Sequence, residues 1–209
     1  MPHLEEFTAG PKSKHIDALS IGLFGLTVGA LTLGLHQANW FGVTEDNYDH
    51  LTVWIMALIF GGIVQIVAGF VEVRYDQQLG GTALTMYGFL WVGISTLGIL
   101  EATTNFEPHP YIEIPLIATF ACFSAVMIYL TGQKTLVLCI LHIVITGTLF
   151  TVVLAKFDLI GWLIPGLGHI AIAIVAFTHA MGTLVNEFTE GSKVPLGKPP
   201  IVPAKNQAH

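Results

Sequence analysis

The sequence predicts an all-α polytopic membrane protein with six transmembrane helices and with both termini in the cytoplasm. Hydrophobic residues make up 53% of the chain and charged residues only 11%, whereas soluble domains carry about 25% charge. The mean hydropathy is +0.71. An α-helix of about 20 apolar residues spans a bilayer and satisfies its own backbone hydrogen bonds. Stretches of this length occur at residues 18–38, 51–71, 79–100, 112–132, 135–155 and 160–185.

The positions of lysine and arginine predict the orientation, because cytoplasmic loops are enriched in both residues. One side of the predicted membrane domain carries Lys12, Lys14, Arg74, Lys134, Lys193, Lys198 and Lys205, and only Lys156 falls on the other side. We therefore expect a cytoplasmic N-terminal segment (1–17), a six-helix transport domain (18–188) and a disordered, proline-rich cytoplasmic tail (189–209). The spans leave no room for a soluble catalytic domain, so we expect a plasma- or inner-membrane protein that is not an enzyme.

Three of the stretches carry small and polar residues at steps of three and four. Such stripes bring helix backbones close together, and their polar members turn away from lipid. Plain helix packing accounts for most of the glycines, whereas the polar members favour a narrow aqueous path along the same faces. The stripes comprise Gly22, Gly25, Gly29, Thr32 and His36 in 18–38; Gly62, Gln65, Gly69 and Glu72 in 51–71; and Gly166, His169, Ala173, Ala176, Ala180, Thr183 and Glu187 at the end of the membrane domain.

Ionisable residues inside the spans are few, and a charge at the bilayer centre costs at least about 2.5–3.5 kcal/mol. His142, His169 and His179 are therefore candidates for contact with a permeating species or a proton, although a neutral histidine bonded to a carbonyl or hydroxyl is the usual alternative. Glu72 and Glu187 lie at predicted cytoplasmic helix ends, where hydration alone can account for them. Neither cysteine has a metal-ligand spacing, and we expect no cofactor and no nucleic-acid partner.

Three segments on three predicted helices carry distinctive motifs. They are residues 61–72, GGIVQIVAGFVE; residues 82–91, TALTMYGFLW; and residues 180–188, AMGTLVNEF. In this order they resemble the second-helix signature, the third-helix segment and the closing segment of the acetate uptake transporter family, which includes bacterial succinate–acetate permeases and fungal acetate and ammonia-export proteins. Because the three matches occur in order on three helices, the resemblance covers the whole predicted membrane core.

The start of the first span departs from the family, whose members open it with Asn-Pro-Ala-Pro-Leu-Gly-Leu. Residues 17–23 here read DALSIGL, so that only the final Gly-Leu is kept. Asp17 remains able to cap the helix by accepting backbone amide hydrogen bonds. The fold should persist, whereas solute contacts at the cytoplasmic mouth can differ from those of other members.

The resemblance implies a pathway through each protomer, a hexameric assembly and a central hydrophobic constriction. Aligning the motifs places Leu26, Tyr87 and Ile143 at the constriction. Polar residues without a fixed charge would line the path and donate hydrogen bonds, namely Gln65, Thr82, Thr85 and Asn186. Candidate mouth or proton-linked residues are Asp17, Glu72, His142, His169 and Glu187.

We therefore expect a permease or channel for acetate and similar small carboxylates, with proton linkage left open. One alternative is a channel for small neutral solutes such as urea, amides or ammonia. A second is a membrane redox protein in which His142, with His169 or His179, ligates a haem. A third is a structural or sensory membrane subunit that transports nothing.

Overall fold

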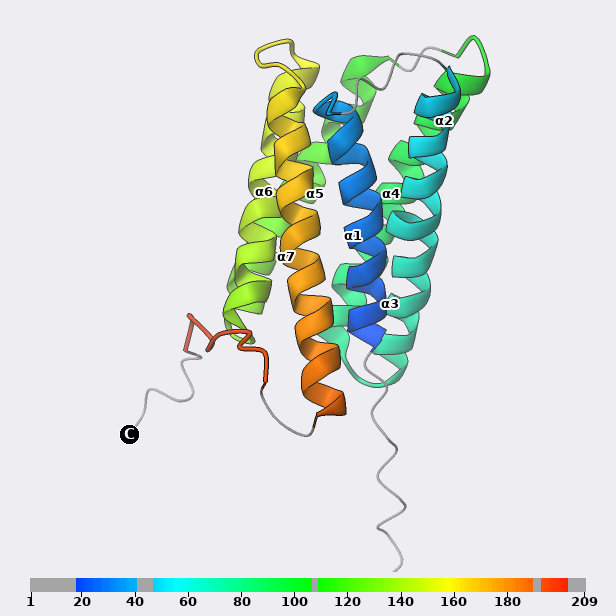
Figure 1. Ribbon diagram of the computed structural model, residues 1–209. Helices are drawn as coiled ribbons and strands as arrows, with labels where there is room; N and C mark the ends of the chain where they lie inside the picture. The colour runs from blue at the N-terminus through cyan, green and yellow to red at the C-terminus, as the bar shows by residue number, and fades with distance from the viewer. Residues whose placement is uncertain (1–17, 41–46, 107–108, 190–192, 203–209) are drawn as a thin grey trace, which may run out of the picture.

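The structure is a computed structural model that describes residues 18–40, 47–106, 109–189 and 193–202. It is a bundle of long helices, shown in Figure 1. The elements are α1 (Ala18–Gln37), α2 (Asn47–Met56), the π-helical segment η1 (Ala57–Val64), α3 (Gln65–Arg74), α4 (Gln78–Thr103), α5 (Pro110–Gly132), α6 (Leu136–Lys156) and α7 (Leu163–Phe188). Because α2, η1 and α3 follow one another without a break, the described residues form six helices long and apolar enough to cross a membrane, which confirms the predicted fold class.

Helix α1 packs between α7 on one side and η1 with α3 on the other, and its glycines allow this close approach. A Cβ atom on Gly29 would lie 3.0 Å from the Cα atom of Gly61, and one on Gly25 would meet the backbone oxygen of Phe60. On the α7 side, Gly34 lies against the backbone of Gly166. The glycines of the predicted stripe therefore serve packing within one protomer.

The start of α1 is capped by a carboxylate from another helix. Glu72, near the end of α3, accepts hydrogen bonds from the amides of Ala18 (2.9 Å) and Leu19 (3.0 Å) through its Oε1 atom. Its side chain is only 3% exposed. An acidic group is favourable at a helix N-terminus, where the first amides have no intrahelical partner. The sequence predicted Asp17 as the cap; Asp17 lies outside the described residues, and the capping carboxylate that the structure shows is Glu72.

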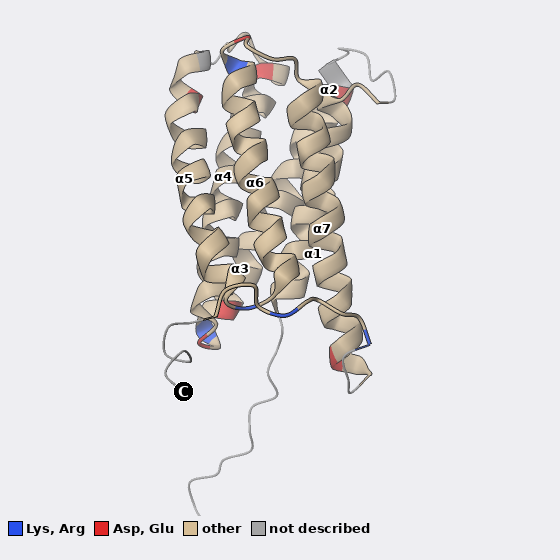
Figure 2. Cartoon of the chain, turned by 90° about the vertical axis from the view of Figure 1, so that its left-hand side faces the viewer, with Lys and Arg blue, Asp and Glu red and all other residues tan. Residues whose placement is uncertain are grey.

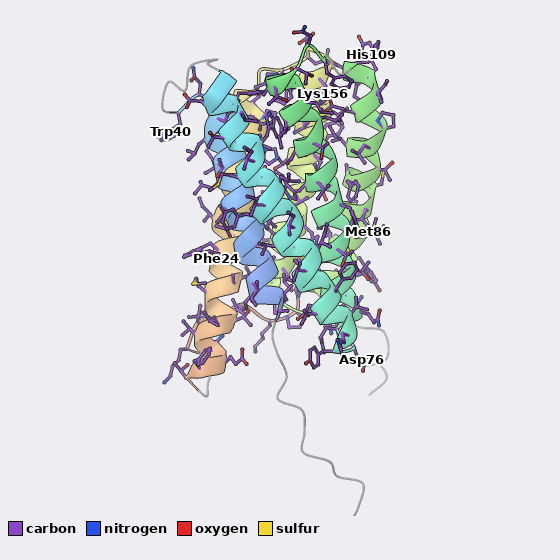
Figure 3. The ribbon with its side chains drawn as sticks, turned by 90° about the vertical axis from the view of Figure 1, so that its right-hand side faces the viewer. Phe24, Trp40, Asp76, Met86, His109 and Lys156 are labelled. Carbon is purple, nitrogen blue, oxygen red and sulfur yellow. The ribbon has the colours of Figure 1, made fainter. Side chains whose placement is uncertain are left out.

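Charged residues lie at the two ends of the bundle (Figure 2). The end that carries Ala18 and residue 202 also carries Arg74, Lys134, Lys193 and Lys198, and we call it the cytoplasmic end from the predicted orientation. Lys156 lies at the opposite, outer end (Figure 3). Apolar side chains such as Phe24 and Met86 point outward between the two ends, where they are 43% and 41% exposed. This distribution fits a bundle surrounded by acyl chains.

Residues 193–202 form a strap across the cytoplasmic ends of α5, α6 and α7. The Asn186 side chain both donates to the backbone oxygen of Val194 (2.9 Å) and accepts from its amide (2.8 Å). Farther along, the amide of Val137 donates to Leu196 (3.1 Å), and the amide of Ile201 donates to Gly132 (3.0 Å). The prediction of a disordered tail is therefore wrong for the strap.

Apolar residues between the prolines explain why the strap has a defined course. Leu196 packs against Gly182 of α7, and Ile201 packs against Gly132 at the end of α5. Gly197 adopts a φ of 77° beside Leu136, a backbone conformation that glycine tolerates best.

Candidate functional site

Two cavities lie end to end along α1, α4 and α6. The inner cavity has a volume of about 530 Å³, and its lining extends from Gln78 and Lys134 at the cytoplasmic end to Leu26 and Tyr87 in mid-span. The outer cavity, of about 540 Å³, extends from Glu101 and Trp162 at the outer end to Leu33 and Leu90. Among the residues that the structure describes, none lines both cavities.

A thin apolar barrier separates the two cavities. Along α4, the lining of the inner cavity ends at Tyr87 and that of the outer cavity begins at Leu90. Along α6 the corresponding residues are Ile145 and Leu149. At a rise of about 1.5 Å per residue, these gaps are only about 4.5 Å and 6 Å long. On α1 the longer gap between the linings contains Ala30, which is fully buried.

Two of the three predicted constriction residues lie at this barrier, and the third does not. Leu26 and Tyr87 are 4% and 5% exposed and line the deep end of the inner cavity. Ile143 is 51% exposed on the outside of α6, so its prediction as a constriction residue is corrected by the structure. Ile145 lines the cavity instead. Two residues correspond to about 200° around an α-helix, so a register error of two reverses the face.

Three nearly buried polar side chains line the inner cavity, and each has a polar atom without a hydrogen-bond partner among the described residues. Gln65, at the start of α3, is fully buried, and neither atom of its amide is bonded. The Tyr87 hydroxyl and Nε2 of His142 are in the same condition. Ser124 lies near the Tyr87 hydroxyl but outside hydrogen-bond geometry.

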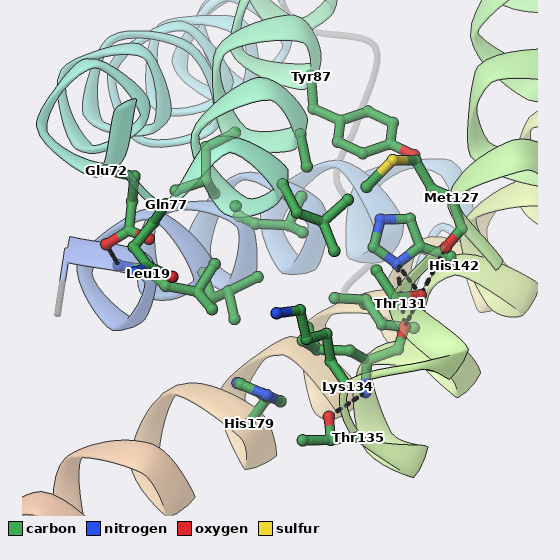
Figure 4. A pocket seen from close by; sticks show the side chains of 18 of the residues that line it. Leu19, Glu72, Gln77, Tyr87, Met127, Thr131, Lys134, Thr135, His142 and His179 are labelled. Atoms are coloured by element: carbon green, nitrogen blue, oxygen red, sulfur yellow. Dashed lines mark hydrogen bonds between the residues drawn. The ribbon is translucent and has the colours of Figure 1, made fainter. Parts of the chain in front are cut away.

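The His142 ring is held by its other nitrogen. Nδ1 lies 2.9 Å from the backbone oxygen of Leu138 and 3.4 Å from the Thr131 hydroxyl. The centroids of the His142 and Tyr87 rings are 5.9 Å apart, and Figure 4 shows both beside Met127. Glu72 near the end of α3 and Lys134 in the turn between α5 and α6 also line this cavity, at its cytoplasmic end.

The other predicted site residues are dispersed. Thr82 is exposed and lines neither cavity, and Thr85 packs against Gly69 in the contact between α3 and α4. Asn186 holds the strap, as described above, and Glu187 beside it is exposed.

The outer cavity contains a hydrogen-bonded chain that the sequence did not predict, although His36 belongs to the small and polar stripe of 18–38. The Trp54 indole Nε1 donates to Nε2 of His50 (3.0 Å), and Nδ1 of His50 lies 3.0 Å from Nε2 of His36. Because Nε2 of His50 accepts the indole proton, Nδ1 carries the ring proton and donates it to His36. The Trp54 ring packs against Gly98 and lines the cavity.

Two further pairs complete the polar lining of the outer cavity. Nδ1 of His169 lies 2.9 Å from Oε1 of Gln37 and 3.0 Å from the backbone oxygen of Pro165. The Lys156 ammonium lies 2.8 Å from Glu113, and the two side chains are 16% and 14% exposed. Since His169 and His142 line different cavities, they are not placed to ligate one haem; His179 shares the inner cavity with His142.

Comparison with known proteins matches most of the chain to one protein family. A family model described as the GPR1/FUN34/yaaH family matches residues 4–190. The chain is 31% identical over 102 residues to Accumulation of dyads protein 2 of Saccharomyces cerevisiae, which covers 46% of this chain and 35% of that protein. It is 30% identical over 102 residues to Ammonia transport outward protein 2 of the same yeast, with the same coverage.

A bacterial relative and a solved structure are also similar. The succinate-acetate/proton symporter SatP of Escherichia coli is 32% identical over 72 residues, which cover 34% of this chain and 35% of that protein. The matched region thus spans about a third of the length of these curated relatives. A structure of the bacterial acetate channel SatP superposes with a TM-score of 0.78 at 22% identity, covering 88% of this chain and all of that one, and it supports the fold.

Proposed function

Because this chain belongs to the GPR1/FUN34/yaaH family, we propose that it is a multi-pass membrane permease or channel for acetate and similar small carboxylates. The observation that supports this function is the pair of cavities, which are aligned along α1, α4 and α6 and are separated by about one helical turn along α4 and α6. Such a barrier blocks the passage of ions because it excludes water. It is nevertheless short enough for a small solute to pass after a modest rearrangement.

In this proposal Leu26, Tyr87 and Ile145 form the inner side of the barrier, and Gln65 and His142 provide hydrogen bonds just before it. Thr82, Thr85, Asn186 and Glu187 have structural or surface roles rather than contacts with the solute. We also propose that the protein functions as a homo-oligomer, and as a hexamer by analogy with the family. Native mass measurement in detergent would test this assembly.

Uptake of labelled acetate into proteoliposomes tests the function. We expect uptake above that of protein-free vesicles when a pH gradient, acidic outside, is imposed. The same vesicles measured without a gradient distinguish proton-linked from passive flux. Flux equal to that of protein-free vesicles under both conditions would contradict the proposal.

A channel for small neutral solutes is the second candidate. It is supported by the name of the yeast ammonia transport outward protein and by the uncharged Gln65, Tyr87 and His142 at the deep end of the inner cavity. Uptake of labelled urea and of ammonia, measured in the same proteoliposomes as the uptake of labelled acetate, separates the two functions. The haem alternative predicts a Soret band in the purified protein, and we expect none.

A further inference from the structure

The inner cavity is lined by three side chains with unpartnered polar atoms, Gln65, Tyr87 and His142, which we call the polar cluster; the Tyr87 and His142 rings lie 5.9 Å apart between centroids. Gln65, Tyr87 and His142 are 0%, 5% and 4% exposed, and each presents a polar atom that no described residue bonds. A buried polar group without a partner is destabilising, so such atoms are normally bonded by water or by a ligand. The cluster therefore has the properties of a site that is complete only when occupied.

The hydrogen bonds of His142 determine what the ring can offer to a ligand. A backbone carbonyl only accepts, so the 2.9 Å contact with Leu138 requires the proton on Nδ1. A neutral ring with its proton on Nδ1 has a lone pair on Nε2, so this nitrogen is an acceptor. An uncharged ring is favoured here, because a buried charge without a counter-ion is unfavourable.

The groups around His142 leave this arrangement in place. Tyr87 of α4 faces the ring, and from α5 the Thr131 hydroxyl lies 3.4 Å from Nδ1, while Ser124 donates to the backbone oxygen of His142. From α7, His179 lines the same cavity. The charged lining residues are Glu72, Asp76 and Lys134, and they belong to the ends of helices and to turns at the mouth.

We propose that this cluster binds its solute as the neutral acid, with the carboxyl O–H donating to Nε2 of His142 and the carbonyl oxygen accepting from the Tyr87 hydroxyl or the Gln65 amide. A carboxylate has only acceptor atoms, so it would oppose the lone pair of His142 without an adjacent cation. The proton then crosses as part of the solute, entering on one side and dissociating on the other. No side chain has to change its charge. This inference depends on the proposed function and adds the protonation state of the solute to it.

An amide of the same size provides a sharp probe. Acetamide presents an N–H donor and a carbonyl acceptor at any pH, so it matches the acid in shape and polarity but does not ionise. Acetic acid has a carboxyl pKa near 4–5, so its neutral fraction falls roughly a hundredfold from pH 5.5 to pH 7.5. The affinity of acetate should therefore depend on pH, whereas that of acetamide should not, and the two ligands should bind at the same site.

Saturation-transfer NMR on the purified full-length protein measures both ligands without the leak of neutral acid through lipid. We expect the apparent Kd of total acetate to rise roughly a hundredfold between pH 5.5 and pH 7.5. The Kd of acetamide should stay constant, and the two ligands should compete. The constant Kd of acetamide serves as the control for any effect of pH on the protein itself.

A variant tests the role of His142 directly. His142→Leu removes the acceptor. The variant should therefore raise the Kd of acetic acid at pH 5.5 and the Kd of acetamide by the same factor of about tenfold. The matched variant His109→Leu, at an exposed histidine of the outer end, should leave both Kd values unchanged. If His142→Leu does not fold, the comparison of the two ligands at two pH values on the unaltered protein still tests whether the neutral acid is the bound form.

The outcomes separate this inference from the proposed function. Acetate that binds equally well or better at pH 7.5, or acetamide that does not compete, would overturn the neutral-acid site and leave acetate transport standing. If acetate neither binds at either pH nor crosses proteoliposomes, both proposals are wrong.

Discussion

The two cavities differ in how their polar groups are satisfied. In the outer cavity Lys156 pairs with Glu113, and Trp54, His50 and His36 form a hydrogen-bonded chain. Among the described residues that line it, only Nδ1 of His36 is a buried side-chain polar atom without a partner. The inner cavity has the opposite character at its deep end, where the unpartnered atoms belong to Gln65, Tyr87 and His142.

This difference shows that the polar groups lining a cavity can affect the protein in two ways, depending on whether they have hydrogen-bond partners. Groups that bond one another stabilise the protein and hold its shape, so they contribute to the empty state. Groups left without partners destabilise the empty state and gain their bonds from whatever enters. On this reasoning the outer cavity is a preformed vestibule, whereas the inner cavity contains the binding site.

The largest expected effect concerns the barrier between the cavities, and it uses two neighbouring isoleucines. Ile145→Trp places an indole at the barrier and should lower acetate flux roughly tenfold or more, because it narrows the path. Ile143→Trp adds the same ring on the exposed face of α6 and should change flux little. Uptake into proteoliposomes, with gel filtration as a check of assembly, measures both. Equal losses in the two variants would contradict the assigned face of α6.

The second prediction breaks the outer pairing. Lys156→Met leaves the Glu113 carboxylate unpaired, and we expect a loss of about 2 kcal/mol, between the values for exposed and fully buried ion pairs. For a chain of this size that loss lowers the apparent Tm by about 4–8 °C. The double variant Lys156→Met/Glu113→Gln should recover most of the loss in a thermal-shift assay. No recovery would mean that Lys156 stabilises through packing alone.

The third prediction compares two glutamines with opposite surroundings. Gln65→Met removes an unpartnered buried amide, so it should stabilise the solute-free protein by about 1 kcal/mol while reducing acetate binding. Gln37→Met removes the amide oxygen bonded to His169 and should destabilise by up to about 1 kcal/mol. Thermal shift without acetate gives the sign of each effect. If both variants shift the Tm in the same direction, the contrast between the cavities is wrong.

The smallest expected effect is local and concerns the strap, whose Leu196 lines the inner cavity. Asn186→Ala removes both hydrogen bonds to Val194, each with a net contribution of about 1 kcal/mol. Hydrogen exchange in residues 193–202 should become faster, with little change in Tm. The adjacent exposed Glu187→Ala provides the control, and equally fast exchange in it would show that Asn186 does not hold the strap.

The fold was predictable because hydrophobicity is a property of whole stretches. All six spans follow from length and composition, and the motifs around Gln65 and Tyr87 placed both residues in the cavity lining. The face of α6 was not predictable in the same way. Apart from His142, the run LVLCILHIVI is apolar on every face, so its hydrophobic periodicity alone does not separate Ile143 from Ile145.

The features that the sequence did not predict arise from contacts between distant segments. His36, His50 and Trp54 form their chain only because α1 and α2 approach each other at the outer end. The cap at α1 joins residues more than fifty positions apart. The strap has the proline-rich composition of a disordered tail, and its order comes from glycines on α5 and α7 that accept its apolar side chains.

The π-helical segment η1 has a consequence for how the helix that contains it is mapped by experiment. Its wider turns mean that residues before Ala57 and after Val64 do not share one helical wheel. Cysteine-scanning accessibility along 49–74 should therefore give two stripes of labelled positions that are offset around the axis. A single wheel drawn through both halves would assign residues near Gln65 to the wrong side.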